Sequence, residues 1–279
     1  MSGWIEEECA EREGVSLLDD VAGYCLSAGG KRFRPVAALA AGDLVGVSVE
    51  WLKPICLALE YIHTFSLIHD DLPALDNDDV RRGRPTAHRQ FGEGPALLAG
   101  DLLFTEAFKI LADMDVPPSA RIKLVELVAG ASRDLCHGQM LDISASARQG
   151  ATLADVKLRH QKKTGALIEA SVLAPTCLLG EEELRRFQPS LEKYARHLGL
   201  LFQIVDDILD RIGTEEEMGR SPGSDQRRAT PTYLTVLGEQ QARELAEHSA
   251  EEARSALRPF GERAAFLEWL IDFVLQRNG

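Results

Sequence analysis

The spacing of apolar residues is the feature that most constrains this fold. Apolar side chains recur every three or four residues along almost the whole chain, and the alternating runs typical of strands are absent. Thr152 and Asp155 also resemble a capping box. The pattern predicts helices over residues 16–27, 35–45, 49–72, 95–114, 118–146, 153–179, 181–211, 232–257 and 259–276, with a break near Gly238. No linker-like change in composition divides the 279 residues, so we expect one all-α domain over residues 1–279.

The composition excludes several classes of protein. The net charge of −13 argues against nucleic-acid binding, because phosphate backbones are held by basic surfaces. The longest apolar run, residues 170–180, contains a proline and is far shorter than the ~20 residues that span a membrane. The N-terminus does not resemble a signal peptide, and the five cysteines show no metal-binding spacing. We therefore expect a cytoplasmic protein with reduced thiols, no transmembrane segment and no nucleic-acid partner.

A cluster of acidic and basic residues follows the third predicted helix. The stretch SLIHDDLPALDNDDVRRGRPTAH, residues 66–88, contains five aspartates and three arginines. Asp70 and Asp71 end the apolar run, and Pro73 stops its regular helical continuation. Asp76 can therefore rejoin the first two aspartates only through the geometry of the loop.

A second acidic cluster ends the helix predicted over residues 181–211. In LLFQIVDDILD, Asp206 and Asp210 are four residues apart and share one helix face, with Asp207 beside them. Like charges at this spacing destabilise a helix, so a compensating cation is expected. Mg²⁺ fits both clusters, because it binds one or two carboxylates together with water and phosphate oxygens.

Three basic segments can bind a phosphate group beside such a metal ion. They are GGKRFRP with Lys31, Arg32 and Arg34, the first acidic loop with Arg81 and Arg82, and QKKTG with Lys162, Lys163 and Thr164. Arginine offers phosphate a two-pronged fork, and lysine offers a compact point charge. Neither a Walker loop nor an EF-hand fits these residues. Each cluster alone could be a solvated surface, but together they predict a site for a metal ion and a phosphate group.

These motifs resemble those of the polyprenyl synthetase family, the trans-isoprenyl diphosphate synthases. DDLPALD resembles the family's first aspartate-rich motif in its bacterial form, and DDILD resembles the second. GGKRFRP, the histidine of EYIHTFSLIHDD, RRGRPTAH, KKTG and FQIVDD match further family motifs in the same order. The resemblance covers about residues 29–238. It implies an all-α, isoprenoid-synthase-type helical bundle around a deep central cavity, and usually a homodimer.

The resemblance also implies roles for individual residues. The Mg²⁺ ligands would be Asp70, Asp76 and Asp206, with Asp71, Asp207 and Asp210 close by. The allylic diphosphate would be held by Arg81, Lys163, Thr164 and Gln203, and isopentenyl diphosphate by Lys31, Arg34, His63 and Arg82. Catalysis would depend on Asp70, Asp76, Arg81, Lys163 and Asp206. Gln203 and His63 could alternatively be ordinary core side chains.

The implied reaction condenses isopentenyl diphosphate with dimethylallyl or geranyl diphosphate. Mg²⁺ and nearby cations would stabilise the leaving diphosphate, and apolar walls would keep water from the allylic cation. In the family, the positions four and five residues before the first motif help form the floor of the product cavity. Bulky Phe65 beside small Ser66 favours farnesyl diphosphate as the product. The alternatives are geranylgeranyl diphosphate synthase, a terpene cyclase and a non-catalytic subunit of a heteromeric synthase.

One loop departs from the family pattern. Where the family has lysines in LGK and KxTYP, this chain has Arg220 and Thr230. Arg220 keeps the positive charge and is expected to contact the diphosphate, whereas Thr230 does not keep it. Arg227 or Arg228 could replace the missing lysine, or both could be solvated surface charges.

Overall fold

The protein is an all-α structure, as the sequence predicts. The computed structural model describes residues 1–145, 150–212 and 230–276. The α-helices are α1 (Ser2–Arg12), α2 (Leu17–Leu26), α3 (Phe33–Val45), α4 (Val49–Asp70), α5 (Ala87–Phe91), α6 (Glu93–Ala112), α7 (Pro118–Ala145), α8 (Leu153–His160), α9 (Ala166–Leu173), α10 (Glu181–Ile212), α13 (Tyr233–Leu237), α14 (Glu239–Leu257) and α15 (Ala265–Leu275). Within the described residues, no helix has the length and apolar character needed to cross a membrane.

Short non-α elements complete the described chain. They are the π-helical segment η1 (Gln161–Gly165), the 3₁₀ segments η2 (Ala174–Leu178) and η3 (Arg258–Ala264), and the antiparallel strands β1 (Val80–Arg81) and β2 (Arg84–Pro85). The single helix predicted over residues 153–179 is therefore α8, η1, α9 and η2 in succession. The predicted break near Gly238 is confirmed, because this residue separates α13 from α14 with a φ of +80°.

Two helices occur where the sequence predicts none. The N-terminal α1 is rich in glutamate, and Ile5 is its one buried residue, so its helical apolar pattern is weak. The five-residue α5 lies between the helices predicted over residues 49–72 and 95–114, where the sequence predicts no helix. A helix this short gives too few turns for periodicity to reveal it.

Side-chain caps fix two helix starts near the predicted positions. The side chain of Ser16 accepts a hydrogen bond from the backbone N–H of Asp19 and so caps α2. The capping box at the start of α8 is confirmed. Thr152 accepts from the Asp155 backbone N–H, and the Asp155 carboxylate accepts from the Thr152 backbone N–H.

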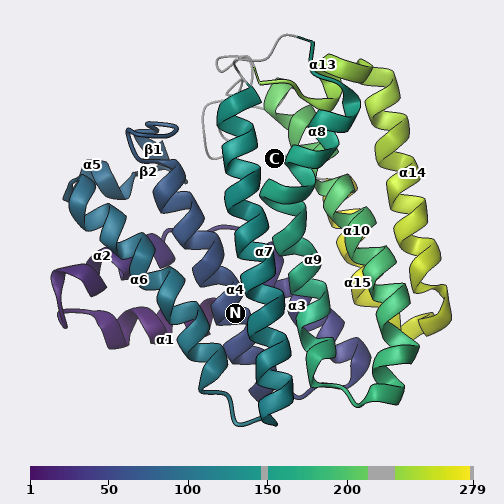
Figure 1. The fold of residues 1–279 in the computed structure, drawn as a ribbon, viewed down its shortest axis with the longest axis horizontal. Helices are drawn as coiled ribbons and strands as arrows, with labels where there is room; N and C mark the ends of the chain where they lie inside the picture. Colours follow the sequence, from purple (N-terminus) through teal and green to yellow (C-terminus); the bar gives the residue numbers. More distant parts are fainter. Residues whose placement is uncertain (146–149, 213–229, 277–279) are drawn as a thin grey trace.

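Two hydrophobic clusters hold the bundle together. One joins α10, α14 and α15, and the other joins α1, α2, α4, α6 and α7; α3 and α9 contribute to both. Figure 1 shows α4 and α7 in the middle of the bundle, α1, α2, α5 and α6 on one side, and α14 and α15 on the other. The β1–β2 hairpin and α13 lie at the same end of the molecule.

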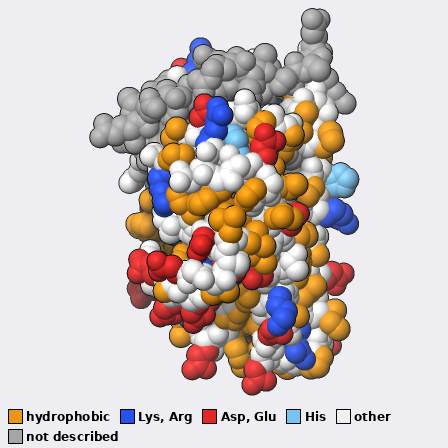
Figure 2. All heavy atoms as spheres, turned by 90° about the vertical axis from the view of Figure 1, so that its left-hand side faces the viewer, with side chains coloured by type: hydrophobic (Ala, Val, Ile, Leu, Met, Phe, Trp, Pro, Cys, Tyr) orange, Lys and Arg blue, Asp and Glu red, His pale blue; other side chains and the backbone are white. Residues whose placement is uncertain are grey.

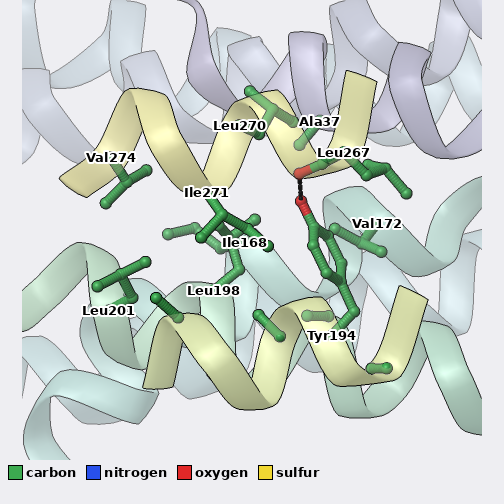
Figure 3. Packing of buried hydrophobic residues seen from close by; sticks show 14 of the residues in the cluster. Ala37, Ile168, Val172, Tyr194, Leu198, Leu201, Leu267, Leu270, Ile271 and Val274 are labelled. Carbon is green, nitrogen blue, oxygen red and sulfur yellow. Dashed lines mark hydrogen bonds between the residues drawn. The ribbon is translucent and has the colours of Figure 1, made fainter. Parts of the chain in front are cut away.

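Figure 3 shows the core where α15 packs over α10. Leu198 from α10 and Ile271 from α15 are fully buried there. Tyr194 is also fully buried, and its hydroxyl donates a hydrogen bond of 2.9 Å to the backbone oxygen of Leu267. This bond satisfies the polar end of a large ring that otherwise contributes apolar contact area.

Glycines allow η1 to lie close to its neighbours. A Cβ atom added to Gly138 of α7 would collide with the backbone of Lys163. On the other side, a Cβ added to Gly199 of α10 would lie 3.4 Å from the Cα of Gly165. The π-helical segment is thus held between two helices. Such segments often occur at functional sites, because they redirect the side chains they carry.

Candidate functional site

The end of α4 and the loop after it bring the aspartates of the first motif together. The backbone N–H of Asp76 donates a hydrogen bond of 2.8 Å to the backbone oxygen of Asp70. Asn77 stabilises the same turn by donating to the Leu72 backbone oxygen at 3.1 Å, and it has a φ of +52°. Asp76 therefore returns to the helix end through loop geometry, as Pro73 requires.

The β1–β2 hairpin directs Arg81 back toward α4. Its two-residue turn, Arg82–Gly83, has positive φ at both positions, 53° and 73°, which is the geometry of a type I′ turn. The Nε of Arg81 lies 2.8 Å from each carboxylate oxygen of Asp71, and its Nη2 donates to Oδ1 at 2.5 Å. Burial raises the pKa of Asp71, and Arg81 opposes that rise. Asp71 thus orients Arg81.

The cations of the GGKRFRP segment contact different partners. Arg32 is the N-terminal cap of α3 and has a φ of +48°. It forms an ion pair with the buried Glu60 and donates to the Leu26 backbone oxygen at 2.6 Å, so it anchors the segment. Lys31 is exposed, and its Nζ lies 6.0 Å from the ring centre of Phe273.

Arg82 contacts the glycines that precede those cations. Its Nη1 donates to the backbone oxygen of Gly29. A Cβ atom on Gly30 would lie 2.5 Å from the Cζ of Arg82, so the missing side chain makes room for the guanidinium. Gly30 also has a φ of +111°, which favours glycine.

His63 lies among the arginines of both basic segments. Burial lowers the pKa of His63 far below its usual value, and the positive charges of Arg34, Arg82, Arg81 and Arg32 lower it further. The imidazole is therefore neutral at physiological pH. Arg34 and Arg82, which are predicted to share one diphosphate with His63, are close enough for their charges to lower its pKa.

Asp70 lies close to Asp76 and Lys163. Burial raises the pKa of Asp70 to about 6, Lys163 opposes this rise, and Asp76 adds to it. Of the charged groups, Lys163 has the largest effect on the Asp70 carboxyl. The first aspartate motif and KKTG thus meet in space, although some ninety positions separate them in the sequence.

Both lysines of η1 are paired with carboxylates of α7. Lys163 donates to Asp142 at 2.5 Å, and Lys162 donates to Asp134 at 2.9 Å. The pKa of Asp142 is lowered, because Lys163 and Arg159 outweigh the effect of burial. Thr164 is half-buried in the same segment. Asp142 is a site residue that the sequence analysis missed; its signal is a carboxylate at the end of the run GQMLD.

The aspartates of the second motif lie at the end of α10. Asp206 is half-buried, whereas Asp207 and Asp210 are 5% and 3% exposed. Asp207 accepts a hydrogen bond of 2.8 Å from the backbone N–H of Tyr233. It therefore fixes the start of α13, while Asp206 is the more accessible of the three carboxylates.

Gln203 is oriented by His160, a second residue that the sequence analysis missed. Arg159 Nη2 lies 2.5 Å from His160 Nε2, and because arginine can only donate, Nε2 must accept. The ring proton is therefore on Nδ1, which donates to Gln203 Oε1 at 2.6 Å. Burial and Arg159 lower the pKa of His160 to about 3, which is consistent with a neutral ring. Arg159 and His160 directly precede QKKTG, and this adjacency is the signal that could have revealed them.

The two chain-length positions are both buried on α4. The ring of Phe65 packs edge-on against Phe104 of α6, with centroids 4.9 Å apart, and Phe104 in turn packs against Phe108 at 5.2 Å. The hydroxyl of Ser66 donates to the backbone oxygen of His63 at 2.8 Å. Phe65 is thus the first ring in an aromatic row that leads away from Asp70.

Part of the altered loop lies outside the described residues. This applies to Arg220, Arg227 and Arg228, whose predicted roles stay predictions. Thr230 is described and is 6% exposed. An uncharged, buried side chain therefore occupies the position where the resemblance leads one to expect a lysine.

The residues at the two helix ends suit a hard divalent cation. Among the described residues, no three His, Cys, Asp or Glu side chains form a ready-made metal cage. Mg²⁺ does not need one, since it keeps several water or phosphate ligands. The oxygen donors of Asp70, Asp76 and Asp206 are the ligand type it prefers.

Comparisons with known proteins identify the family of this chain. The sequence model described as polyprenyl synthetase matches residues 15–259. The chain is 44% identical to the farnesyl diphosphate synthase of Escherichia coli (strain K12) over 258 residues, 90% of this chain and 86% of that enzyme. It is 42% identical to the geranylgeranyl diphosphate synthase of Cyanophora paradoxa over 273 residues, 96% of this chain and 90% of that enzyme.

A solved structure shares the whole fold. The Helicobacter pylori geranyltransferase, crystallised with magnesium and isoprenyl diphosphate, superposes with a TM-score of 0.80 at 28% identity. The match covers 98% of this chain and 94% of that one. This protein is therefore a short-chain trans-prenyltransferase with the all-α isoprenoid-synthase fold, and it belongs to the polyprenyl synthetase family.

Proposed function

We propose that this prenyltransferase condenses isopentenyl diphosphate with dimethylallyl or geranyl diphosphate and that its main product is farnesyl diphosphate. The observation that carries the proposal is the meeting of Asp70, Asp76 and Lys163 at the end of α4. There, carboxylates able to hold a divalent cation lie beside a cation able to hold a phosphate. The family uses divalent metal ions, and we infer that the ion here is Mg²⁺.

The metal ligands in this proposal are Asp70, Asp76 and Asp206. Bound Mg²⁺ would neutralise the diphosphate and stabilise the negative charge that develops as it leaves. Asp71 and Asp207 already accept hydrogen bonds from Arg81 and Tyr233, so their main task is orientation, with Asp210 buried behind them.

The allylic diphosphate binds between the two aspartate motifs. Arg81, Lys163, Thr164 and Gln203 would contact it, and Arg81 and Lys163 would stabilise its charge as the C–O bond breaks. The Oε1 of Gln203 accepts from His160, so the amide NH₂ is the end that can donate to a phosphate oxygen. Arg220 belongs to this group by its motif alone.

Isopentenyl diphosphate binds to Lys31, Arg34, His63 and Arg82. The electrostatic influence of Arg34 and Arg82 on His63 supports a shared anion site. His63 is also close enough to Arg81 for that charge to lower its pKa, and Arg81 contacts Asp71 at the end of α4. Isopentenyl diphosphate would therefore be held next to the allylic diphosphate. Apolar side chains of α4 and α6 would then surround the growing chain and exclude water from the carbocation.

Phe65 is the reason to favour a C15 product. The named relatives include both a farnesyl and a geranylgeranyl diphosphate synthase, so kinship does not choose between the two products. Phe65 lies five residues before Asp70, which is about 7.5 Å along a helix. Its packing against Phe104 would close the space that a longer chain needs.

We also propose that the chain folds as one domain and that two copies of it form a homodimer through the face made by α2, α5 and α6. Figure 2 shows hydrophobic side chains gathered across the middle of this face. Leu97 and Leu98 of α6 are 46% and 56% exposed. Sedimentation equilibrium at micromolar concentration should give twice the chain mass of 30.6 kDa. A mass of one chain would exclude the dimer.

The metal assignment predicts a large loss of turnover. Chelation with excess EDTA should abolish product formation, and Asp70→Ala or Asp206→Ala should lower kcat about 10²–10³-fold or more, because a charge-stabilising ligand is lost. Folding should be preserved, as judged by circular dichroism. The control is Asp113→Ala, which removes an exposed carboxylate paired with Lys109. Full activity in EDTA would contradict the assignment. No product from the unmodified chain would favour a non-catalytic subunit.

The chain-length assignment predicts a longer product from Phe65→Ala. Incubation with radiolabelled isopentenyl diphosphate and sizing of the products should show a shift from C15 toward C20. Phe108→Ala is the matched control, because this ring is two steps further along the aromatic row. It should leave the product unchanged while Phe65 is present. An unchanged C15 product from Phe65→Ala would move the cavity floor to another helix.

The anion site around Arg82 predicts a difference between two neighbouring glycines. Gly30→Ala should displace the Arg82 guanidinium and raise the KM for isopentenyl diphosphate about tenfold. Gly29→Ala is the matched control: its φ is also positive, at +82°, but a Cβ there meets nothing within 4 Å. It should cost only backbone strain and leave this KM nearly unchanged. Equal effects from both variants would remove Arg82 from the site.

A further inference from the structure

Arg159 is a buried arginine that the proposed mechanism does not yet use. It is the penultimate residue of α8 and is 5% exposed. Its Nε lies 3.3 Å from Asp142 Oδ1, and its Nη2 lies 2.5 Å from both His160 Nε2 and the backbone oxygen of Pro231. Burying a charged group is unfavourable unless its partners compensate, and these contacts come from three separate segments.

Two of these partners lead directly to the allylic diphosphate site. Asp142 also accepts a hydrogen bond from Lys163, at 2.5 Å, and His160 also donates to Gln203, at 2.6 Å. Arg159 is therefore one residue away from both of these proposed diphosphate contacts.

The third partner belongs to the segment that enters α13. Arg159 holds the Pro231 carbonyl from one side, and Asp207 accepts from the Tyr233 N–H on the other. Thr230, the residue before Pro231, is buried and carries no charge. Arg159 thus places a positive charge beside Pro231, next to the position where Thr230 carries no charge.

Sharing Asp142 has a consequence for Lys163. A carboxylate paired with one lysine holds it firmly, whereas a carboxylate shared between two cations divides its charge between them. Arg159 therefore weakens the hold of Asp142 on Lys163. The ammonium group can then turn to a phosphate oxygen at a lower cost.

We propose that Arg159 is a positioning residue for the allylic diphosphate. It keeps Lys163 available through Asp142, fixes the amide of Gln203 through His160, and anchors the chain at Pro231. This inference rests on the proposed function, which assigns the allylic diphosphate to Lys163 and Gln203.

The test compares four variants of the whole chain, one of them Thr230→Lys alone, with a matched control. Arg159→Met removes the charge, and Arg159→Lys keeps it without the fork that reaches several partners at once. The third variant combines Arg159→Met with Thr230→Lys and returns a cation beside Pro231. The control, Arg185→Met, removes an exposed arginine that pairs with Glu181 across one helical turn. The measurements are kcat, the KM values for dimethylallyl and isopentenyl diphosphate, and Tm.

A positioning role predicts a split between the two KM values. Arg159→Met should raise the KM for dimethylallyl diphosphate about tenfold and that for isopentenyl diphosphate less than twofold. Arg159→Lys should fall between Arg159→Met and the unmodified protein, and it carries the test if Arg159→Met does not fold. In the Arg159→Met background, Thr230→Lys should lower the KM for dimethylallyl diphosphate at least threefold. When Arg159 is present, Thr230→Lys should leave this KM unchanged.

Two results would overturn the inference. One is a set of kinetic constants for Arg159→Met and Arg159→Lys that all lie within twofold of the Arg185→Met values. The other is a lower Tm with both KM values changed equally and no rescue by Thr230→Lys, which would indicate a purely structural role. No turnover by the unmodified protein would instead overturn the proposed function, and this inference with it.

Discussion

Asp70 and Asp76 lie close together at the end of α4, where burial already disfavours negative charge. The rest of the site depends on this unfavourable pair. Lys163 offsets part of its charge from η1, and Arg81 is directed at the neighbouring Asp71 by the tight β1–β2 turn. A site whose carboxylates repel each other, with cations around them, suits the divalent metal and the diphosphate of the proposed function. The same repulsion makes these aspartates poor contributors to stability, so their presence is better explained by function.

Much of the fold and of the candidate site could be predicted from the sequence, because long helices and short charged motifs leave strong local signals. The helices over residues 118–146 and 181–211 appear within one residue of the predicted bounds. The approach of KKTG to Asp70 could not be predicted from local spacing, because it depends on how α7, η1 and α10 pack. The resemblance to a known family supplied this pairing before the structure did.

The residues that sequence reasoning missed act through other side chains. Asp142, Arg159 and His160 lie outside the motifs, and only weak local signals separate them from ordinary buried polar residues: the end of the run GQMLD for Asp142, and adjacency to QKKTG for the other two. Their importance appears only as contacts: Asp142 with Lys163, and His160 with Gln203. A motif can name the group that meets a substrate. The groups that aim it are set by tertiary packing, which has no fixed spacing along the chain.

The π-helical turn at Gln161–Gly165 determines which sides of α8 and α9, the helices before and after it, point toward the core. An i→i+5 turn holds more residues than an α-helical turn, so it shifts the angular phase of everything that follows. The polar side of α8, with Arg159 and His160, can face the Pro231 segment, while the next turns present Leu167 and Ile168 to the core. Removing one residue here would bring both halves into a single phase. Either the side with Arg159 and His160 would then turn away from the Pro231 segment, or the apolar side of α9 would turn away from the core. This five-residue turn therefore sets the rotation of α8 relative to α9.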